Sequence, residues 1–278
     1  MEISLPPALG YHFCPMTKCA NCGTPLKGKY CSACGQSAHE GHAPTVRHFV
    51  HDVTHEFLHV DGKIGRSAKA LLTSPGLLTK EYWAGHVVNW VRPIRLFLIV
   101  AALHLFVSPG IGPMNFQILL FRNARGVVTL GVSPTPQNEA RTKKLQLLPE
   151  EERESALERF EKAYHLIRYF SPIMYAFASW FLYRRRQPFF VNHLVGGLHF
   201  YAFWYALAIL VGLLSRWQEN LSYLGIFSLV YLYLTLKRLY VESRFLTLVK
   251  TAVMYIYLVA VELVLALIAM STVMPHLV

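Results

Sequence analysis

The chain has 278 residues, of which 54% are hydrophobic and only 15% are charged, and its mean hydropathy is +0.33. Soluble domains usually carry about 25% charged residues, so the composition excludes an ordinary soluble domain and predicts a multi-pass membrane protein. The formal net charge of +11 is then explained by membrane topology and by contact with anionic membrane lipids. Binding to nucleic acid is therefore not expected.

Two Cys-x-x-Cys pairs mark the first segment, residues 1–38. They are Cys19 with Cys22 and Cys31 with Cys34, and a glycine follows each pair. Two thiolates at this spacing can hold one metal ion from a tight turn, in which the glycine takes a positive φ angle. Disulfides would instead require an oxidising compartment, and no secretory signal precedes the cysteines. The pattern predicts a zinc ribbon with a structural Zn²⁺, whose four cysteine ligands leave no coordination position open for catalysis.

Residues 45–92 are predicted to form amphipathic helices on the cytoplasmic surface of the membrane. In residues 46–60, apolar side chains share one helical face and histidines share the other. These histidines are His48, His51, His55 and His59. They could bind a second metal ion, form a pH-sensitive surface, or be the solvated side of the helix. The sequence leaves these interpretations open.

The same helix contains His55-Glu56-Phe57-Leu58-His59, which matches the HExxH pattern of zinc metalloproteases. In those enzymes the two histidines bind zinc and the glutamate is the general base. A third ligand is required, and Glu81 is the candidate. The pattern arises easily in a helix rich in histidine, and the chain has no phosphate-binding loop, nucleophile elbow or dinucleotide fingerprint. The sequence therefore favours a role that is not enzymatic.

Hydrophobic segments predict about five transmembrane helices. The first covers residues 93–107. Four more lie within residues 166–278, at 166–183, 193–214, 220–236 and 248–270, each near the roughly 20 residues that a bilayer requires. Residues 108–165 form an extracytoplasmic loop, with a helix that opens at Pro149 and runs directly into the second span. The predicted fold class is an all-α integral membrane protein with amphipathic surface helices and a small zinc ribbon.

Basic residues predict the orientation. The loops after the second and fourth spans, together with Lys250 at the start of the fifth span, hold seven Lys and Arg residues, whereas the loop after the third holds Arg216. Basic loops remain in the cytoplasm, which is also where thiols stay reduced and available to zinc. We expect a bacterial inner-membrane protein with a cytoplasmic N-terminus and an extracytoplasmic C-terminus.

Two ionisable residues stand out inside the predicted spans, His104 in the first and Glu262 in the fifth. Their depths differ by only about 5 Å at 1.5 Å per residue, so the two could be partners. Such a pair can relay protons or ions, or it can be a hydrogen bond that packs helices together.

Several short motifs follow one another between residues 19 and 105. After the cysteine pairs come His55-Glu56-Phe57-Leu58-His59-Val60-Asp61-Gly62-Lys63, Leu71-Leu72-Thr73-Ser74-Pro75-Gly76, Glu81-Tyr82-Trp83-Ala84-Gly85-His86 and Arg92-Pro93-Ile94-Arg95-Leu96-Phe97. This order resembles a bacterial family of multi-pass membrane proteins, a domain of unknown function with an N-terminal zinc ribbon. The resemblance implies the architecture and no activity.

The sequence favours a membrane scaffold, sensor or assembly factor in contact with membrane lipids. Its zinc ribbon would dock a cytoplasmic protein partner or order the surface helices. One alternative is a transporter or channel that uses His104 and Glu262. Another is a metal-dependent membrane enzyme, an HExxH-type protease or a lipid-modifying enzyme, that uses the histidine face.

Overall fold

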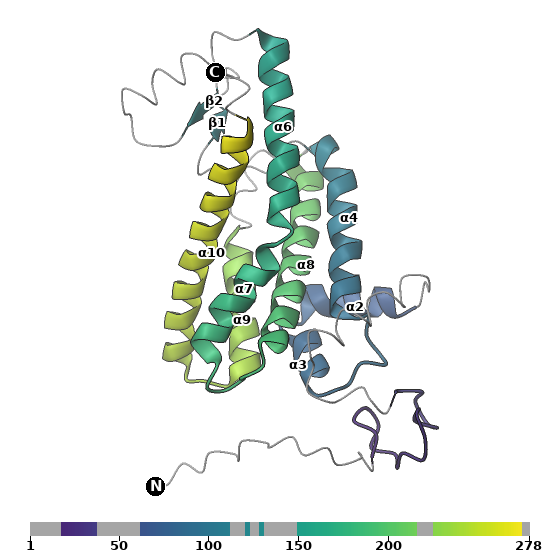
Figure 1. Ribbon diagram of the computed structural model, residues 1–278. Coiled ribbons are helices and arrows are strands. Elements are labelled where there is room, and N and C mark those ends of the chain that lie inside the picture. The colour runs from purple at the N-terminus through teal and green to yellow at the C-terminus, as the bar shows by residue number, and fades with distance from the viewer. Residues whose placement is uncertain are drawn as a thin grey trace.

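The computed structural model describes residues 18–37, 62–111, 120–122, 128–130, 149–215 and 225–273. This part of the chain is mainly helical (Figure 1). Its helices are α2 (Lys63–Thr73), α3 (Leu77–Trp83), α4 (Pro93–Ile111), α6 (Glu150–Arg168), α7 (Ser171–Tyr183), α8 (Phe190–Ser215), α9 (Gly225–Tyr240) and α10 (Arg244–Val273). Two short strands, β1 (Leu120–Arg122) and β2 (Val128–Leu130), pair antiparallel with Leu120 opposite Leu130.

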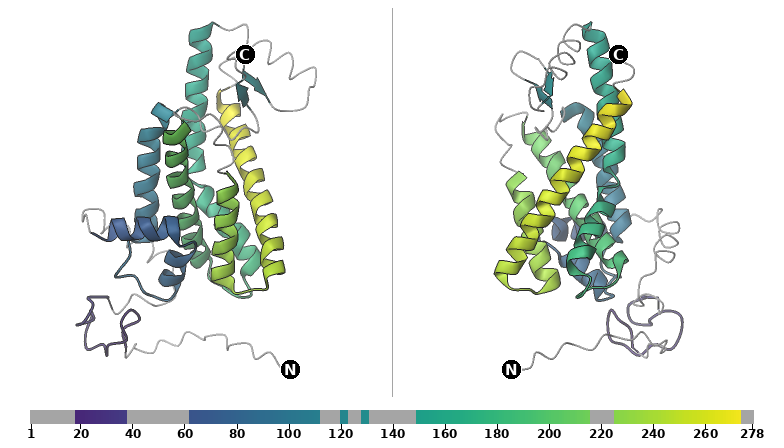
Figure 2. Two further views of the ribbon diagram at one scale, coloured as in Figure 1. Left: turned by 180° about the vertical axis from the view of Figure 1, so that it is seen from behind. Right: turned by 60° about the vertical axis from the view of Figure 1, so that its left-hand side comes forward.

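Helix α8 is the centre of the bundle and packs against α4 and α7. Its buried side chains face several directions around the helix, which agrees with a sequence that is apolar on all sides. Helix α10 lies at the outside, against α6, α7 and α9 (Figures 1 and 2). The core that joins these helices is rich in aromatic side chains, including Tyr175, Tyr183 and Tyr205, each 1% exposed.

Helices α6 and α7 are separated by a break. The prediction that the helix opening at Pro149 runs directly into the second span is therefore wrong. Pro172 stands in the first turn of α7 and has no N–H to donate to the carbonyl of Arg168, so the helical ladder breaks there. The hydroxyl of Tyr205 donates to that carbonyl instead, at 3.4 Å. Gly197 on α8 lets the broken segment approach closely, because a Cβ at this glycine would lie 2.4 Å from the carbonyl oxygen of Pro172.

Helices α2 and α3 lie toward one end of the bundle, where α2 runs crosswise near the lower end of α4 (Figures 1 and 2). The buried face of α2 consists of Ser67, Ala70 and Leu71. The hydroxyl of Ser67 accepts from the backbone N–H of Val91 at 2.9 Å. The hydroxyl of Tyr231, on α9, donates to the carbonyl of Leu71 at 2.9 Å. These bonds fix α2 to the bundle.

Among the described residues, two helical segments are long and apolar enough to cross a membrane, Phe190–Val211 in α8 and Arg244–Ala269 in α10. The apolar helix Pro93–Val107 is shorter. Helix α7 has 13 residues and α9 has 16, or about 20 and 24 Å at 1.5 Å per residue, less than the roughly 30 Å of a hydrocarbon core. The structure therefore does not support the predicted number of about five spans.

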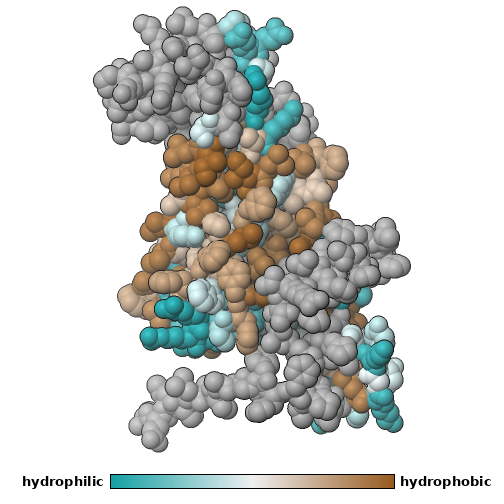
Figure 3. Space-filling model, viewed as in Figure 1, coloured by the Kyte–Doolittle hydropathy of each residue, from teal (hydrophilic) through white to brown (hydrophobic). Residues whose placement is uncertain are grey.

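The outer surface of the bundle carries many exposed apolar side chains. Figure 3 shows them across the middle of the molecule, with polar side chains toward both ends. Phe106 on α4 is 84% exposed, Phe181 on α7 is 67% exposed and Ile256 on α10 is 68% exposed. The apolar surface is thus spread over several helices.

Candidate functional site

The two cysteine pairs form two turns with the same hydrogen-bond pattern. In the first, the N–H of Gly23 donates to the carbonyl of Cys19, and in the second the N–H of Gly35 donates to the carbonyl of Cys31, both at 2.9 Å. Gly23 and Gly35 have φ angles of 73° and 74°, values that favour glycine. The sequence builds each turn locally, and each turn presents two thiols on the same side.

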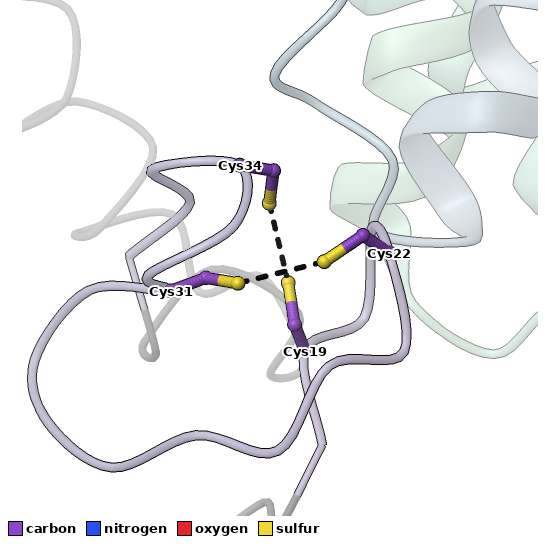
Figure 4. A group of neighbouring side chains, drawn as sticks. All are labelled: Cys19, Cys22, Cys31 and Cys34. Carbon is purple, nitrogen blue, oxygen red and sulfur yellow. Dashed lines mark hydrogen bonds between the residues drawn. The ribbon is translucent and has the colours of Figure 1, made fainter.

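The four sulfur atoms converge. The side chains of Cys19, Cys22, Cys31 and Cys34 point toward a common centre (Figure 4), and their Sγ atoms all lie within 4.8 Å of one another. The distance is 3.6 Å between the sulfurs of Cys19 and Cys34, and 3.5 Å between those of Cys22 and Cys31. A tetrahedral ion with metal–sulfur bonds of about 2.3 Å holds its sulfurs about 3.8 Å apart. The cluster therefore fits one metal ion and is consistent with zinc.

The surroundings favour an ionised thiol at Cys22, whereas burial raises the pKa of the Cys34 thiol to about 11. The hydroxyl of Thr24 lies 3.3 Å from the sulfur of Cys22. Hydrogen bonds from the side chain and the backbone of Thr24 lower the pKa of the Cys22 thiol to about 6. Cys19 and Cys31 are 4% and 3% exposed, so a bound cation would supply the charge that holds them as thiolates. Four thiolates complete a tetrahedral shell, which suits a structural ion.

The cysteine module is joined to the helical bundle through Gln36. This side chain is 2% exposed, and its Nε2 donates to the backbone carbonyl of Gly85 at 2.8 Å. The backbone carbonyl of Gln36 accepts from the N–H of Cys31 at 2.8 Å. One residue thus holds the second cysteine turn and contacts the loop between α3 and α4.

The predicted histidine face lies outside the described residues, because the structure does not describe His48, His51, His55 or His59. The proposed third ligand is described. A carboxylate oxygen of Glu81 lies 3.0 Å from Nδ1 of His86, and both side chains are partly exposed. Glu81 therefore has a partner in the turn that follows its own helix.

Glu262 has an ionic partner that sequence analysis missed. Its Oε2 lies 3.2 Å from Nε of Arg168, and the two side chains are 8% and 4% exposed. Tyr164 donates to the same oxygen at 2.9 Å. Ser171 and Tyr201 donate to the other oxygen at 3.2 and 3.4 Å. The carboxylate therefore links α6, α7 and α8 to α10.

His104 belongs to the same region of the bundle. It is 4% exposed, and its ring centroid lies 4.8 Å from that of Tyr205. The guanidinium of Arg168 lies 5.7 Å from the Tyr205 ring and 3.8 Å from that of Trp204. His104 therefore contacts Tyr205, which also lies beside Arg168. The ionic partner of Glu262, however, is Arg168. The sequence did contain a signal for this ion pair, because Arg168 is a single basic residue inside the predicted span 166–183.

His193 on α8 is the centre of a second buried group that the sequence did not reveal. Its Nε2 lies 2.9 Å from the carbonyl of Gln187, which accepts a hydrogen bond. Nδ1 is then the acceptor, and it lies 3.1 Å from the hydroxyl of Ser179 and 2.9 Å from that of Tyr240. The indole N–H of Trp83 donates to the carbonyl of Asn192 at 3.0 Å. This group ties α3, α7 and α9 to the start of α8.

Residues 61–110 match the family described as "Protein of unknown function (DUF3667)". No curated protein and no solved structure matches the chain. The matched segment contains α2, α3 and α4 up to residue 110, together with Gly85, which accepts the hydrogen bond from Gln36. The resemblance to a domain of unknown function is confirmed over this segment, and so is the convergence of the four cysteines that precede it.

Proposed function

We propose that the protein is a membrane-embedded scaffold in which a Zn²⁺ ion, bound by the four cysteines, orders the end of the helical bundle and presents a surface to a cytoplasmic partner. The observation that carries this proposal is the bond from Gln36 to Gly85. It joins the metal-binding turn to the DUF3667 segment through a side chain that is 2% exposed. A metal ion that fixes the turn therefore also fixes its contact with the bundle.

The exposed surface supports insertion in a membrane. In the apolar windows of the two long helices, 67% of the residues are buried in α8 but only 22% in α10. A soluble protein rarely exposes so large an apolar surface, whereas lipid tails would cover it. Figure 3 agrees with this arrangement, since the apolar side chains form a zone between two polar ends. Membrane lipids are accordingly the proposed surroundings of α10.

The distribution of charge supports a cytoplasmic position for the cysteine module. Three arginines, Arg184, Arg185 and Arg186, follow α7, and Lys237 and Arg238 lie in the last turn of α9. Figures 1 and 2 place these helix ends at the end of the bundle that carries α3 and the cysteine module. Under the positive-inside rule this end faces the cytoplasm, and in a bacterium the membrane would be the inner membrane.

The surface of the module offers a site for a protein partner. Tyr30 is 67% exposed, next to the buried Cys31, and Lys27 and Lys29 are exposed beside it. Exposed tyrosines are typical contact residues at interfaces, and the two lysines can attract opposite charges on a partner. We propose that this surface binds an acidic patch on the partner.

Metal analysis and hydrogen–deuterium exchange test the ordering role. We expect one zinc per purified chain. Gln36→Ala should keep this zinc and increase exchange of the backbone amides in residues 84–92, and Ser32→Ala, at an exposed position of the same module, is the matched control. Cys19→Ser with Cys22→Ser should lose the zinc and increase the same exchange. Unchanged exchange in both variants would exclude the ordering role, and a chain without zinc would exclude the metal.

Photo-crosslinking in native membranes tests the docking role. A photoreactive amino acid at position 30 should give a defined crosslinked protein, and the product should disappear when Cys19 and Cys22 are replaced by serine. The same amino acid at Leu72, which is 50% exposed on α2, is the control for random contacts. Identical products at both positions would remove the docking role.

Transport is a second candidate, favoured by the buried charges of Arg168 and Glu262. Ionisable residues inside a membrane mark ion and proton pathways in many proteins. In this bundle, however, three hydroxyl groups and a guanidinium contact the carboxylate, which supports a role in packing. Proton flux in liposomes that depends on Glu262 would reverse this preference. The alternative of a metal-dependent enzyme rests on histidines outside the described residues and stays a prediction.

A further inference from the structure

His199 on α8 is a buried histidine that the proposed function does not use. It is 5% exposed, and its Nδ1 is hydrogen bonded to the hydroxyl of Thr79 on α3 at 2.9 Å. Its other nitrogen, Nε2, is buried and has no hydrogen-bond partner among the residues that the structure describes. A buried ring nitrogen that can donate or accept a hydrogen bond almost always has a partner in a folded protein.

Thr235 on α9 presents a second atom of the same kind. It is 3% exposed, and within the described part of the chain its Oγ1 also has no hydrogen-bond partner. A threonine hydroxyl inside a helix can bond to the carbonyl one turn earlier, as Thr251 does to Thr247 at 2.7 Å. Thr235 does not use this option, so its hydroxyl is available to another molecule.

His199 and Thr235 line the same cavity. Its other walls are the turn between α2 and α3, with Ser74 and Gly76, and parts of α3, α8 and α9. The cavity has a volume of about 10 Å³, measured as space for the centre of a water-sized sphere, and one water molecule needs about 10 to 15 Å³ by this measure. No carboxylate is present among the residues that line it, so a divalent cation lacks the ligands that it prefers.

We propose that this cavity is a binding site for one ordered water molecule, held by Nε2 of His199 and Oγ1 of Thr235. Water fits both the volume and the chemistry, because it can donate to one of these atoms and accept from the other. The molecule would link α8 to α9 beside the hydrogen bond from α8 to α3. It would therefore lie at the joint between the DUF3667 segment and the rest of the bundle.

The backbone shows how closely this joint is packed. Gly76, in the turn between α2 and α3, has a φ angle of 74°, and a Cβ there would lie 3.1 Å from Cα and 3.2 Å from the carbonyl oxygen of Thr235. The turn therefore contacts the backbone of α9 directly. The space left beside Thr235 is too small for a side chain and suits a molecule with one heavy atom.

An experimental structure that resolves ordered water tests the site in the unmodified protein. A density peak should lie within about 3.2 Å of both His199 Nε2 and Thr235 Oγ1, the usual limit for such hydrogen bonds. A structure without this peak, or one in which either atom bonds to a protein group instead, overturns the proposal.

A double-mutant cycle tests the same site in solution by thermal unfolding of the purified protein. His199→Asn keeps an amide near the position of Nδ1, and so the contact with Thr79, but removes Nε2. Thr235→Val keeps the shape of the side chain and removes the hydroxyl. Because a shared water couples the two residues, the Tm shift of the double variant should differ from the sum of the single shifts by more than about 2 °C.

The control cycle pairs His199→Asn with Thr251→Val, since Thr251 is also a buried threonine but bonds to its own helix. The Tm shifts of His199→Asn and Thr251→Val should be additive. If the Tm shifts of His199→Asn and Thr235→Val are also additive, the proposal of a shared water is overturned. If His199→Asn fails to fold, the structure of the unmodified protein still decides the proposal.

Discussion

The Nε atom of Arg168, at the end of α6, lies 3.2 Å from a carboxylate oxygen of Glu262 in the last helix, α10. Both side chains are more than nine-tenths buried. The outer face of α10 carries many exposed side chains, and Lys250 near its start pairs with Glu242 at 2.8 Å. The pair of Arg168 and Glu262 therefore contributes to the position of the last helix in the bundle.

Replacing Glu262 by Gln should strongly destabilise the protein, because it leaves the guanidinium of Arg168 buried without a counter-charge. The loss of one partner of a buried ion pair costs about 3 to 5 kcal/mol, which thermal unfolding in detergent can measure. Glu81→Gln is the control, because its contact with His86 is partly exposed and such pairs contribute about 0 to 1 kcal/mol. Equal losses in the two variants would contradict a specific role for the buried pair.

Acidification should release the metal from the cysteine cluster, since each thiolate that is protonated ceases to be a ligand. Without metal the pKa of the Cys22 thiol is lowered to about 6 by Thr24, so at neutral pH protons compete weakly with zinc for this ligand, and they compete more strongly as the pH falls. Thr24→Val removes the side-chain bond and raises this pKa. Half of the zinc should then be released at a higher pH than in the unmodified protein, as a chromogenic chelator can report.

Thr73→Val is the control for the zinc release. Its hydroxyl donates to a carbonyl within α2, at 2.8 Å, away from the cysteines. The release curve of this variant should overlay that of the unmodified protein. A curve for Thr24→Val that also overlays it would show that Thr24 has no influence on the ligand.

Gly197→Ala should destabilise the contact between α7 and α8. The new Cβ would lie 2.4 Å from the carbonyl oxygen of Pro172, which is backbone and can move only if α7 moves. Strain of this kind typically costs about 1 to 3 kcal/mol, and the Tm should fall. Gly65→Ala on α2 meets nothing within 4 Å and should be neutral or stabilising by up to about 1 kcal/mol. A similar effect of both substitutions would argue against the close contact.

Val241→Asn should stabilise the protein. Val241 connects α9 to α10 with a φ angle of 47°, a region that is unfavourable for a β-branched residue by about 1 to 2 kcal/mol. Asparagine tolerates this conformation, and the valine side chain is 78% exposed, so little packing is lost. A rise in Tm is expected, and a fall would mean that the valine side chain has a contact worth more than the strain.

The cysteine cluster could be predicted from the sequence because each turn is local and needs only its own residues. The partner of Glu262 could not, because helix depth alone does not show which helices are neighbours. Depth suggested His104 as the partner of Glu262, but the carboxylate pairs with Arg168, at the start of the predicted second span. To predict a tertiary contact of this kind, one must know the rotation of each helix about its own axis as well as its depth.

The number of membrane spans was overestimated because hydropathy counts apolar residues, whereas crossing a membrane requires an unbroken length. Pro172 marks the break between α6 and α7 in the sequence, but the glycine that accommodates it lies 25 residues later on α8. That contact has no local signature. The sequence thus allowed the all-α class to be predicted, but not the length of each helix.

The side chain of Tyr205 meets two different demands at one position. Its hydroxyl donates to the backbone carbonyl of Arg168 at the end of α6, and its ring lies beside the guanidinium of the same residue and the imidazole of His104. One aromatic side chain thereby supplies a hydrogen bond to a carbonyl at a helix end and also packs beside a buried charge. Phenylalanine can meet the second demand alone, and an aliphatic residue can meet neither, so the range of residues compatible with this position is narrower than its burial would suggest.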